Sequence, residues 1–220
     1  MSITIQPATP EMAATAATLI HHALGPVSDY LFATDDPIQT QKLIEALFLR
    51  PGNRFSHQWA DVAVDEQGRV LGIALSFPYD ETPKLEWATA MQLLDITRLN
   101  HFLRFLGRSM PMVGVSEAEK GDYYLSDIAV TPEARGQGVG KMLLQHVEDK
   151  GRRQGFRRLA LTVARDNKHA VEFYRRQGFR VLSERGSPTL EKRAGYAGFY
   201  RMVKELGGEK VAQTSTAASR

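Results

Sequence analysis

Apolar and polar positions in the first third of the chain switch between two periods, one typical of strands and one typical of helices. Ile3 and Ile5 alternate with polar neighbours, which predicts a short strand that ends at Pro7. A Thr9-Pro10 pair and an Asp36-Pro37 pair each precede apolar residues at helical spacing, and Thr9 is in N-cap position. The region is expected to hold a strand at 3–7, helices at 10–24 and 37–48, and strands at 57–65 and 69–77.

Residues 78–121 interrupt this alternation. Leucine and isoleucine residues between 96 and 106 share one helical face, which predicts a single long helix from Lys84 to about Leu106. An irregular loop is expected from 107 to 121. Two interpretations of this helical insertion remain open: it covers the sheet, or it forms a substrate lid or a dimer contact.

The second half of the chain alternates strands and helices. We expect strands at 123–130, 156–163, 179–184 and 198–204, helices at 141–150 and 167–177, and a loop at 186–196. Strand, turn, helix and strand in succession imply a mixed α/β sheet with a parallel crossover. The tail at 206–220 is mostly Gly, Ser, Thr and Ala, and we expect it to be disordered.

Composition excludes several classes of protein. With 220 residues, 43% hydrophobic and 24% charged, the chain is neither fibrous nor wholly disordered. It has no Cys, which excludes disulfides, thiolate metal sites and a Cys nucleophile. Its six His are scattered without metal-ligand spacing, so no metal is expected. No segment reaches the roughly 20 apolar residues of a membrane span, and no signal peptide is evident at the start. We therefore expect a cytoplasmic protein that binds no membrane.

The charges are unevenly distributed. Residues 1–130 carry 9 Lys and Arg against 16 Asp and Glu, whereas residues 131–185 carry 13 against 6. The basic segment suits an anionic ligand, and the acidic half faces either a cationic molecule or solvent. A patchwork surface without function is the alternative. The basic residues do not form one run with interleaved aromatics, so no nucleic-acid partner is expected.

Three glycines lie directly after one predicted strand and directly before the next helix. Gly136, Gly138 and Gly140 let the backbone approach a ligand closely. The first N–H groups of the helix are unpaired and lie at its positive dipole end, which favours an anion such as a pyrophosphate. Arg135 and Lys141 add positive charge at the rim. A plain structural turn is the alternative.

Two other phosphate-binding motifs do not fit. A Walker A loop ending at Gly140-Lys141 needs Gly at the position of Arg135 and Ser or Thr at that of Met142. A dinucleotide fingerprint needs Gly at the position of Lys141 or Leu143. Both motifs are excluded letter by letter.

The segment that does fit is Arg135-Gly-Gln-Gly-Val-Gly140, preceded by Ile-Ala-Val-Thr-Pro-Glu. It resembles the acyl-CoA-binding motif of the GNAT acetyltransferase superfamily. A second block, from Asn167 to Phe179, is similar to that superfamily's Asn-x-x-Ala-x-x-Phe/Leu-Tyr-x-x-x-Gly-Phe. The stronger resemblance covers 123–185 and a weaker one covers 1–205. It implies one GNAT-like α/β domain over 1–205, with a mixed, mostly antiparallel sheet, a central parallel pair, and helices on both faces.

The resemblance implies acetyl-CoA as cosubstrate. In this family the strand ending at Val130 separates from its neighbour, and the pantetheine arm lies in the gap. Backbone groups of Ile128 and Val130 would hold the arm, and the turn would hold the pyrophosphate. The cofactor-binding candidates are Ile128, Ala129, Val130, Arg135, Gly136, Gln137, Gly138, Val139, Gly140, Lys141, Asn167 and Tyr174.

The same resemblance suggests catalytic roles. The Val130 N–H would stabilise the oxyanion, and Tyr174 would protonate the leaving thiolate unless it only packs on its helix. The base is open. Asp127 is the only carboxylate within its strand, but it could instead be an internal hydrogen-bond anchor. Ser126 could orient a water. Because neighbouring strand residues point to opposite faces, these two are not expected to share a pocket. Asp122 is expected in solvent; unranked alternatives are Asp29, Asp80, Glu81 and Glu86.

The sequence therefore predicts an N-acetyltransferase that transfers an acetyl group from acetyl-CoA to a primary amine. Attack is direct, in a ternary complex, and the acceptor is a small molecule or a peptide. A non-catalytic acyl-CoA-binding module and a protein N-terminal or lysine acetyltransferase are the alternatives. The insertion discriminates between them: folded over the central strand it favours small molecules, whereas on a partner in a homodimer it leaves an open groove.

Overall fold

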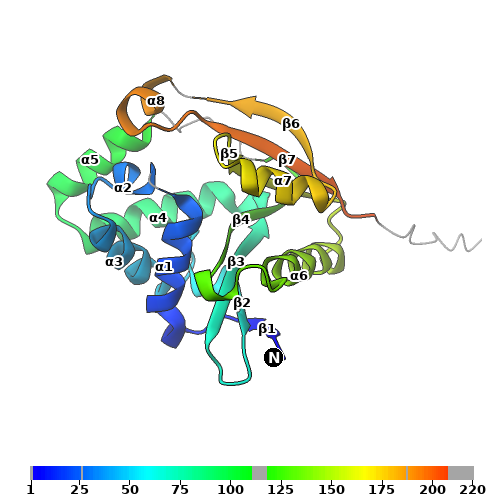
Figure 1. Cartoon of the computed structure of the whole chain (residues 1–220). Coiled ribbons are helices and arrows are strands. Elements are labelled where there is room, and N and C mark those ends of the chain that lie inside the picture. Colours follow the sequence, from blue (N-terminus) through cyan, green and yellow to red (C-terminus); the bar gives the residue numbers. More distant parts are fainter. Residues whose placement is uncertain (1, 26, 111–117, 187, 208–220) are drawn as a thin grey trace, which may run out of the picture.

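The computed structural model describes residues 2–25, 27–110, 118–186 and 188–207, which fold around one seven-stranded sheet (Figure 1). The strand order is β1-β2-β3-β4-β5-β7-β6. Neighbouring strands are antiparallel except for the central pair, β4 and β5. The strands are β1 (Thr4–Pro7), β2 (Ala60–Val64), β3 (Val70–Pro78), β4 (Tyr123–Val130), β5 (Arg158–Ala164), β6 (Arg180–Arg185) and β7 (Phe199–Glu205). The predicted mixed sheet with a central parallel pair is confirmed.

Helices cover both faces of the sheet, as predicted (Figure 1). They are α1 (Ala13–Leu24), α2 (Val27–Leu31), α3 (Pro37–Phe48), α4 (Thr82–Ile96), α5 (Leu99–Ser109), α6 (Val139–Arg153), α7 (Lys168–Arg176) and α8 (Pro188–Ala194). Among the described residues, none of these helices combines the length and hydrophobicity that a bilayer-spanning segment requires.

The two larger of three hydrophobic cores formed by the described residues lie on opposite faces of the sheet. The first, here called the α1 core, packs α1 and α3 on β2 and β3; its fully buried members include Ile20, Ile44, Val62 and Ile73. The second, here called the α6 core, packs α6 and α7 on β4 and β5; its members include Leu143, Val147, Leu159 and Tyr174. Because β4 borders both cores, each of its two faces contacts a different set of helices.

The long helix predicted from Lys84 to Leu106 is wrong in detail, because the chain forms two helices. Thr97 is extended, with φ −123° and ψ 171°, and its Oγ1 donates to the Leu93 carbonyl at 2.6 Å. A Thr hydroxyl that bonds to its own backbone competes with helix propagation. The predicted loop from residue 107 is also wrong at its start, since α5 continues to Ser109; residues 111–117 lie outside the described part.

Three smaller predictions need correction. The strand expected from 57 begins at Ala60, because 57–59 form a 3₁₀ turn capped by the Ser56 hydroxyl. The first helix begins as a 3₁₀ turn at 10–12, and Thr9 makes no side-chain cap bond there. The loop expected at 186–196 contains α8.

The predicted helix starts at Asp36 and Asn167, and the predicted helix end at Gly178, are confirmed by the structure. Asp36 Oδ1 accepts a hydrogen bond from the Ile38 N–H at 3.0 Å, and Asn167 Oδ1 accepts one from the Ala170 N–H at 3.1 Å. Gly178 follows α7 with φ +89°, as expected of a left-handed helix terminus. The tail predicted to be disordered falls outside the described residues from 208 onward.

Candidate active site

The two parallel strands at the centre of the sheet pair only over a short length. Residue pairs between β4 and β5 run from Tyr123–Leu159 to Leu125–Leu161 and then stop. Both strands continue, β4 to Val130 and β5 to Ala164, without pairing further. The sheet therefore has a gap at its centre, with free backbone edges on either side.

The backbone of β4 presents two residues to this gap. The Thr131 N–H donates to the Leu71 carbonyl on β3 at 2.9 Å. In an antiparallel pair, residues that bond to the neighbour alternate with residues that do not. The alternation directs the N–H and C=O groups of Ile128 and Val130 away from β3, toward the gap, and those of Ala129 toward β3.

The glycine turn leads into α6 with its amides unpaired. Gly136 and Gly138 have φ of +76° and +82°, a conformation that favours Gly. Within the described structure, Met142 is the first α6 residue with a paired N–H, which donates to the Gly138 carbonyl at 3.0 Å. The N–H groups of 138–141 are available at the positive end of the helix dipole, an arrangement that binds anions.

Not every residue of the turn lines the large cavity beside it. Arg135 and Lys141 line this cavity, and their side chains are exposed. Neither forms an ion pair within the described part of the chain. Gln137 does not line it: its N–H donates to the Ala134 carbonyl at 3.4 Å and its side chain donates to the Glu133 carbonyl at 2.7 Å.

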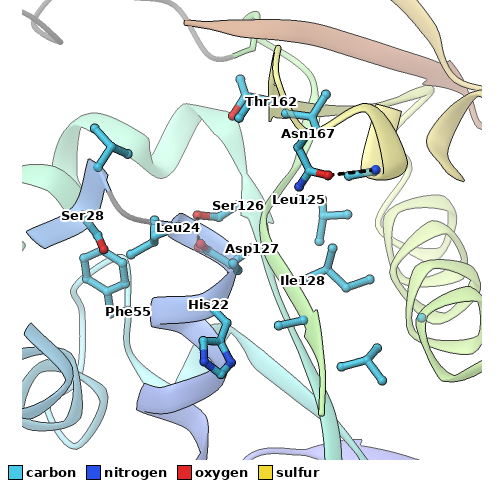
Figure 2. A pocket seen from close by; sticks show the side chains of 18 of the residues that line it. His22, Leu24, Ser28, Phe55, Leu125, Ser126, Asp127, Ile128, Thr162 and Asn167 are labelled. Atoms are coloured by element: carbon cyan, nitrogen blue, oxygen red, sulfur yellow. Dashed lines mark hydrogen bonds between the residues drawn. The ribbon is translucent and has the colours of Figure 1, made fainter. Parts of the chain in front are cut away.

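One cavity of about 1150 Å³ joins the turn, the gap and the N-terminal helices (Figure 2). At one end it is lined by 134–136 and 138–141, and in the middle by 124–130 of β4 and 162–164 of β5. At the other end it is lined by residues of α1, α2, α4 and α5. The segment predicted as a lid or a dimer contact thus forms part of the wall.

A β-bulge places two polar side chains of β4 in this cavity. The pairing with β3 shifts between Leu75 and Ser76, which leaves Ser126 as an extra residue. Leu125 and Ile128, three residues apart, both pack against the α6 core, so the two residues between them face the opposite side. The expectation that Ser126 and Asp127 could not share a pocket is therefore wrong, because it assumed regular alternation.

The two side chains are in direct contact. Ser126 Oγ donates a hydrogen bond to Asp127 Oδ2 at 2.6 Å, and both line the cavity (Figure 2). Asp127 is only 4% exposed. A bulge also increases the local twist of its strand. The bulge lies directly after Leu125, where the pairing of β4 with β5 ends. The gap therefore begins at the same position as the Ser126–Asp127 pair.

Tyr174 reaches the cavity from α7. Its ring is buried in the α6 core, in edge contact with Phe173 and Phe179. Burial, and then the negative charge of Asp127, raise the pKa of the Tyr174 phenol above its usual range. The phenol is therefore protonated at neutral pH. Asn167, which also lines the cavity, caps the same helix.

Comparison with known proteins gives this arrangement a family. Residues 27–179, more than half of the chain, match the sequence profile described as the Acetyltransferase (GNAT) family. The chain belongs to the GNAT family. The match includes both blocks on which the resemblance was based, the glycine turn and the Asn167–Phe179 segment.

Curated acetyltransferases align with the chain over shorter segments. An uncharacterized N-acetyltransferase of Methanocaldococcus jannaschii is 32% identical over 93 residues, 42% of this chain and 36% of that protein. The streptothricin acetyltransferase of Streptomyces lavendulae is 42% identical over 55 residues, 25% of this chain and 29% of that protein. The chain thus spans about a third of the length of these relatives.

Solved structures share the GNAT fold over nearly the whole chain. An N-acetyltransferase from Staphylococcus aureus Mu50 superposes with a TM-score of 0.71 at 21% identity, covering 91% of this chain and 98% of that one. The PaiA N-acetyltransferase from Thermoplasma acidophilum, determined in complex with coenzyme A, gives 0.52 at 15% identity, covering 93% and 99%. At these identities the likeness concerns the fold.

Sequence reasoning missed one charged residue of this GNAT site. Arg54, between α3 and β2, lines the cavity and donates from Nη2 to Ser126 Oγ at 3.3 Å. Arg54 Nη1 lies 3.5 Å from Glu86 Oε1. Glu86, one of the alternative bases considered from the sequence, therefore also lines the cavity. Arg54 belongs to no motif, and only the tertiary fold brings it to β4.

The other carboxylates considered as bases lie elsewhere. Asp29 pairs with His21 Nε2 at 2.8 Å, and Asp80 and Glu81 are not among the lining residues. Asp122, expected in solvent, is 1% exposed and pairs with Arg158 and Arg201, because the chain folds both guanidinium groups over it. Among the described residues no group of three or more His, Asp or Glu is arranged to hold a metal ion.

Proposed function

We propose that this GNAT protein is an acyltransferase that moves the acetyl group of acetyl-CoA to a primary amine of a small molecule. One observation carries the proposal: a single cavity runs from a turn of free amides, through a gap between parallel strands, to the buried carboxylate of Asp127. Cosubstrate, reacting atoms and acceptor can therefore meet in one continuous cavity.

The residues at the turn suit coenzyme A chemically. The unpaired N–H groups of 138–141 and the side chains of Arg135 and Lys141 offer donors and positive charge to a pyrophosphate. The free backbone groups of Ile128 and Val130 can pair with the amides of an extended pantetheine arm. The coenzyme A complex of a protein with this fold supports the assignment.

The reaction divides among three groups. Asp127 accepts a proton from the ammonium, and the free amine attacks the thioester carbonyl, forming a C–N bond. The Val130 N–H, directed into the gap, stabilises the oxyanion that develops. The C–S bond then breaks, and the leaving thiolate takes a proton from Tyr174, whose buried phenol is neutral. The nitrogen gives up its second proton as the tetrahedral intermediate collapses, which restores the phenol, and Asp127 releases the first proton to solvent. The products are the acetamide and coenzyme A.

The wall opposite the gap favours a small acceptor over a protein. Glu86, Thr89 and Ala90 of α4 and Phe105 of α5 line the cavity, so these helices lie over the acceptor end. An extended polypeptide would need an open groove across that position. Acceptors that are small enough to enter the cavity fit without movement of α4 or α5.

The experiment has two parts. Calorimetry with acetyl-CoA tests binding, and thiol release across a panel of amines, amino acids and peptides tests transfer. We expect binding and transfer in the wild type, and Asp127→Asn should lower kcat by about 10²-fold or more while acetyl-CoA binding changes little.

Asp80→Asn is the matched control, because that carboxylate is exposed and outside the cavity, and it should leave both readouts unchanged. Binding without transfer to any amine would make the protein an acyl-CoA-binding module. Full activity of Asp127→Asn would show that another group accepts the proton of the acceptor ammonium.

A further inference from the structure

The acceptor end of the cavity has a hydrocarbon wall. Six apolar side chains line it, from α1, α2 and the turn that follows it, α5, and the α3–β2 loop: Leu24, Val27, Leu31, Phe32, Phe55 and Phe105. The Phe32 ring lies 5.7 Å from that of Phe55 and 6.2 Å from that of Phe105, centroid to centroid. Figure 2 places Leu24, Ser28 and Phe55 together on one side of the Ser126–Asp127 pair.

Two of the hydroxyl groups at this end, those of Ser28 and Thr89, are engaged with the chain's own backbone, and Ser109 also lines the cavity. Ser28 Oγ donates to the Gly25 carbonyl at 2.7 Å. Thr89 Oγ1 donates to the Leu85 carbonyl at 2.7 Å and accepts from the Arg54 N–H at 3.1 Å. A polar substituent of the acceptor at these positions would have to displace an existing hydrogen bond. Otherwise it would lose its bound water without gaining a new hydrogen bond, which costs free energy.

The charged groups are confined to the opposite side of this end. Among the described residues they are Asp127, Glu86 and Arg54, and the imidazole of His22 lines the same end (Figure 2). The Arg54 guanidinium is held between Ser126 Oγ and the Glu86 carboxylate, at 3.3 and 3.5 Å. The three formal charges sum to −1, so this end favours a cation with one positive charge and disfavours a carboxylate.

We propose that the acceptor is a primary monoamine whose amino group is carried on an aliphatic or aromatic hydrocarbon body. The ammonium lies against Asp127, beside the gap, and the body packs on the side chains of α2, α5 and Phe55. This inference rests on the proposed function and narrows its substrate class. It excludes polyamines, amino sugars and amino acids as preferred acceptors, since each would place a second charge or several hydroxyls on the hydrocarbon wall.

The test is a series of amines at saturating acetyl-CoA. From ethylamine to hexylamine, kcat/KM should rise by about fourfold for each methylene that reaches the wall. Phenethylamine should exceed glucosamine, spermidine and a free amino acid by at least tenfold. A preference for spermidine, glucosamine or an amino acid would overturn this inference and leave the acetyltransferase proposal intact. Absence of transfer to every amine, with acetyl-CoA still bound, would instead overturn the proposed function.

Variants locate the selectivity. Phe105→Ala should flatten the dependence of kcat/KM on chain length and leave acetyl-CoA affinity unchanged, because Phe105 lies at the acceptor end. Phe105→Leu, which keeps an apolar side chain, should retain most of the dependence. Leu103→Ala is the matched control on the same helix, since Leu103 is 58% exposed and outside the cavity. A steep series in folded Phe105→Ala would contradict the placement of the hydrocarbon body.

Discussion

Tyr174 combines packing and chemistry in one side chain. Its ring is an integral part of the α6 core, in contact with Phe173 and Phe179, and the same residue lines the cavity. Burial raises the pKa of the phenol, and the charge of Asp127 raises it further. The two interpretations left open from the sequence, acid or packing residue, are thus compatible in space.

A Tyr174→Phe variant separates these contributions. It keeps the ring and removes the acidic proton, so we expect kcat to fall by about 10²-fold with little change in the free energy of unfolding below pH 10. Because the pKa is raised, the wild-type phenol remains an acid up to at least pH 10, and the deficit should persist across pH 6–10. Steady-state kinetics across that range check this.

The control for this variant is Tyr200→Phe, a tyrosine of β7 that packs against the α6 core without lining the cavity. It should behave as the wild type. Undiminished kcat of Tyr174→Phe at every pH would show that the thiolate leaves without this phenol.

Single residues were predictable where a local rule applies. Asn167 as a helix cap and Gly138 in a left-handed turn follow from backbone geometry that depends on few neighbours. Ser126 and Asp127 were misplaced because a bulge depends on the partner strand, which the β4 sequence does not encode. Arg54 was missed because it reaches the site only through the packing of α3 and α4.

Among the elements, the glycine turn yields a sharp contrast between two positions. Gly138 has φ +82°, where a Cβ is strained although the space around it is open. Gly140 has ordinary helical geometry, and a Cβ there would lie 3.6 Å from Val130 Cγ2, a normal contact. The two glycines are two residues apart, but only one is required by the backbone.

Gly138→Ala should therefore weaken acetyl-CoA binding by about tenfold, because reshaping the turn costs roughly 1–2 kcal/mol. Gly140→Ala is the matched control and should stay within about twofold of the wild type. Isothermal calorimetry measures both. Equal losses in the two variants would indicate that side-chain bulk, rather than backbone conformation, governs the site.

A cluster of charges ties the beginning of β4 to β5 and β7. Arg201 and Arg158 each donate to Glu119 and Asp122, at distances of 2.5 to 3.3 Å. Hydrogen bonds from Arg201 and then Arg158 lower the pKa of Glu119 to about 2. The carboxylate is thus more acidic in the folded chain than in the unfolded one, so folding depends on its ionisation.

This depression fixes the sign of a pH effect. The stabilisation is complete above about pH 4.5, the ordinary pKa of Glu, and is lost as pH falls toward 2. Glu119→Gln should flatten the dependence of the unfolding free energy on pH within that window, as measured by urea titration. Glu172→Gln, an exposed site on α7, is the control. An unchanged slope in Glu119→Gln would show that the cluster forms only weakly in solution.

The seven strands were predictable in number, whereas the helices were not, because α2, α8 and the division of α4 from α5 were missed. Alternation and periodicity gave the strands, but the break at Thr97 lacks Gly or Pro, and the apolar face continues across it through Ile96, Phe102 and Phe105. Two helices reach the α1 core from different directions, which one straight helix could not do. Tertiary burial therefore overrides the local pattern at this point.

At the scale of the whole molecule, the gap is a local opening in a sheet whose α6 core spans both β4 and β5. The α1 core and the α6 core are joined through β3 and β4, while β4 and β5 share only three residue pairs. The mixed sheet was predictable because a crossover helix between parallel strands leaves few topologies, and the family resemblance narrowed them further. The position of α4 and α5 over the cavity depended on packing that no motif records.

A ligand that fills this gap and binds the folded chain should stabilise it against unfolding. At 100 times its Kd, acetyl-CoA should add about 2.7 kcal/mol to the free energy of unfolding, which for this size raises Tm by about 5–10 °C. Differential scanning calorimetry checks the shift, and hydrogen exchange should slow most at the Ile128 and Val130 amides. A Tm independent of acetyl-CoA concentration would rule out binding to the folded chain.

The additional residue in β4 has a consequence for deletions. Removing the Ser126 codon would leave Leu125 and Ile128 on the same face as before, because Asp127 would take the vacated step in the pleat. The residues of the α6 core would keep their positions. Without the bulge β4 would twist less, and its pairing with β5 would extend beyond Leu125. The shortened chain would fold with its sheet sealed, a stable protein that gives no calorimetric heat with coenzyme A.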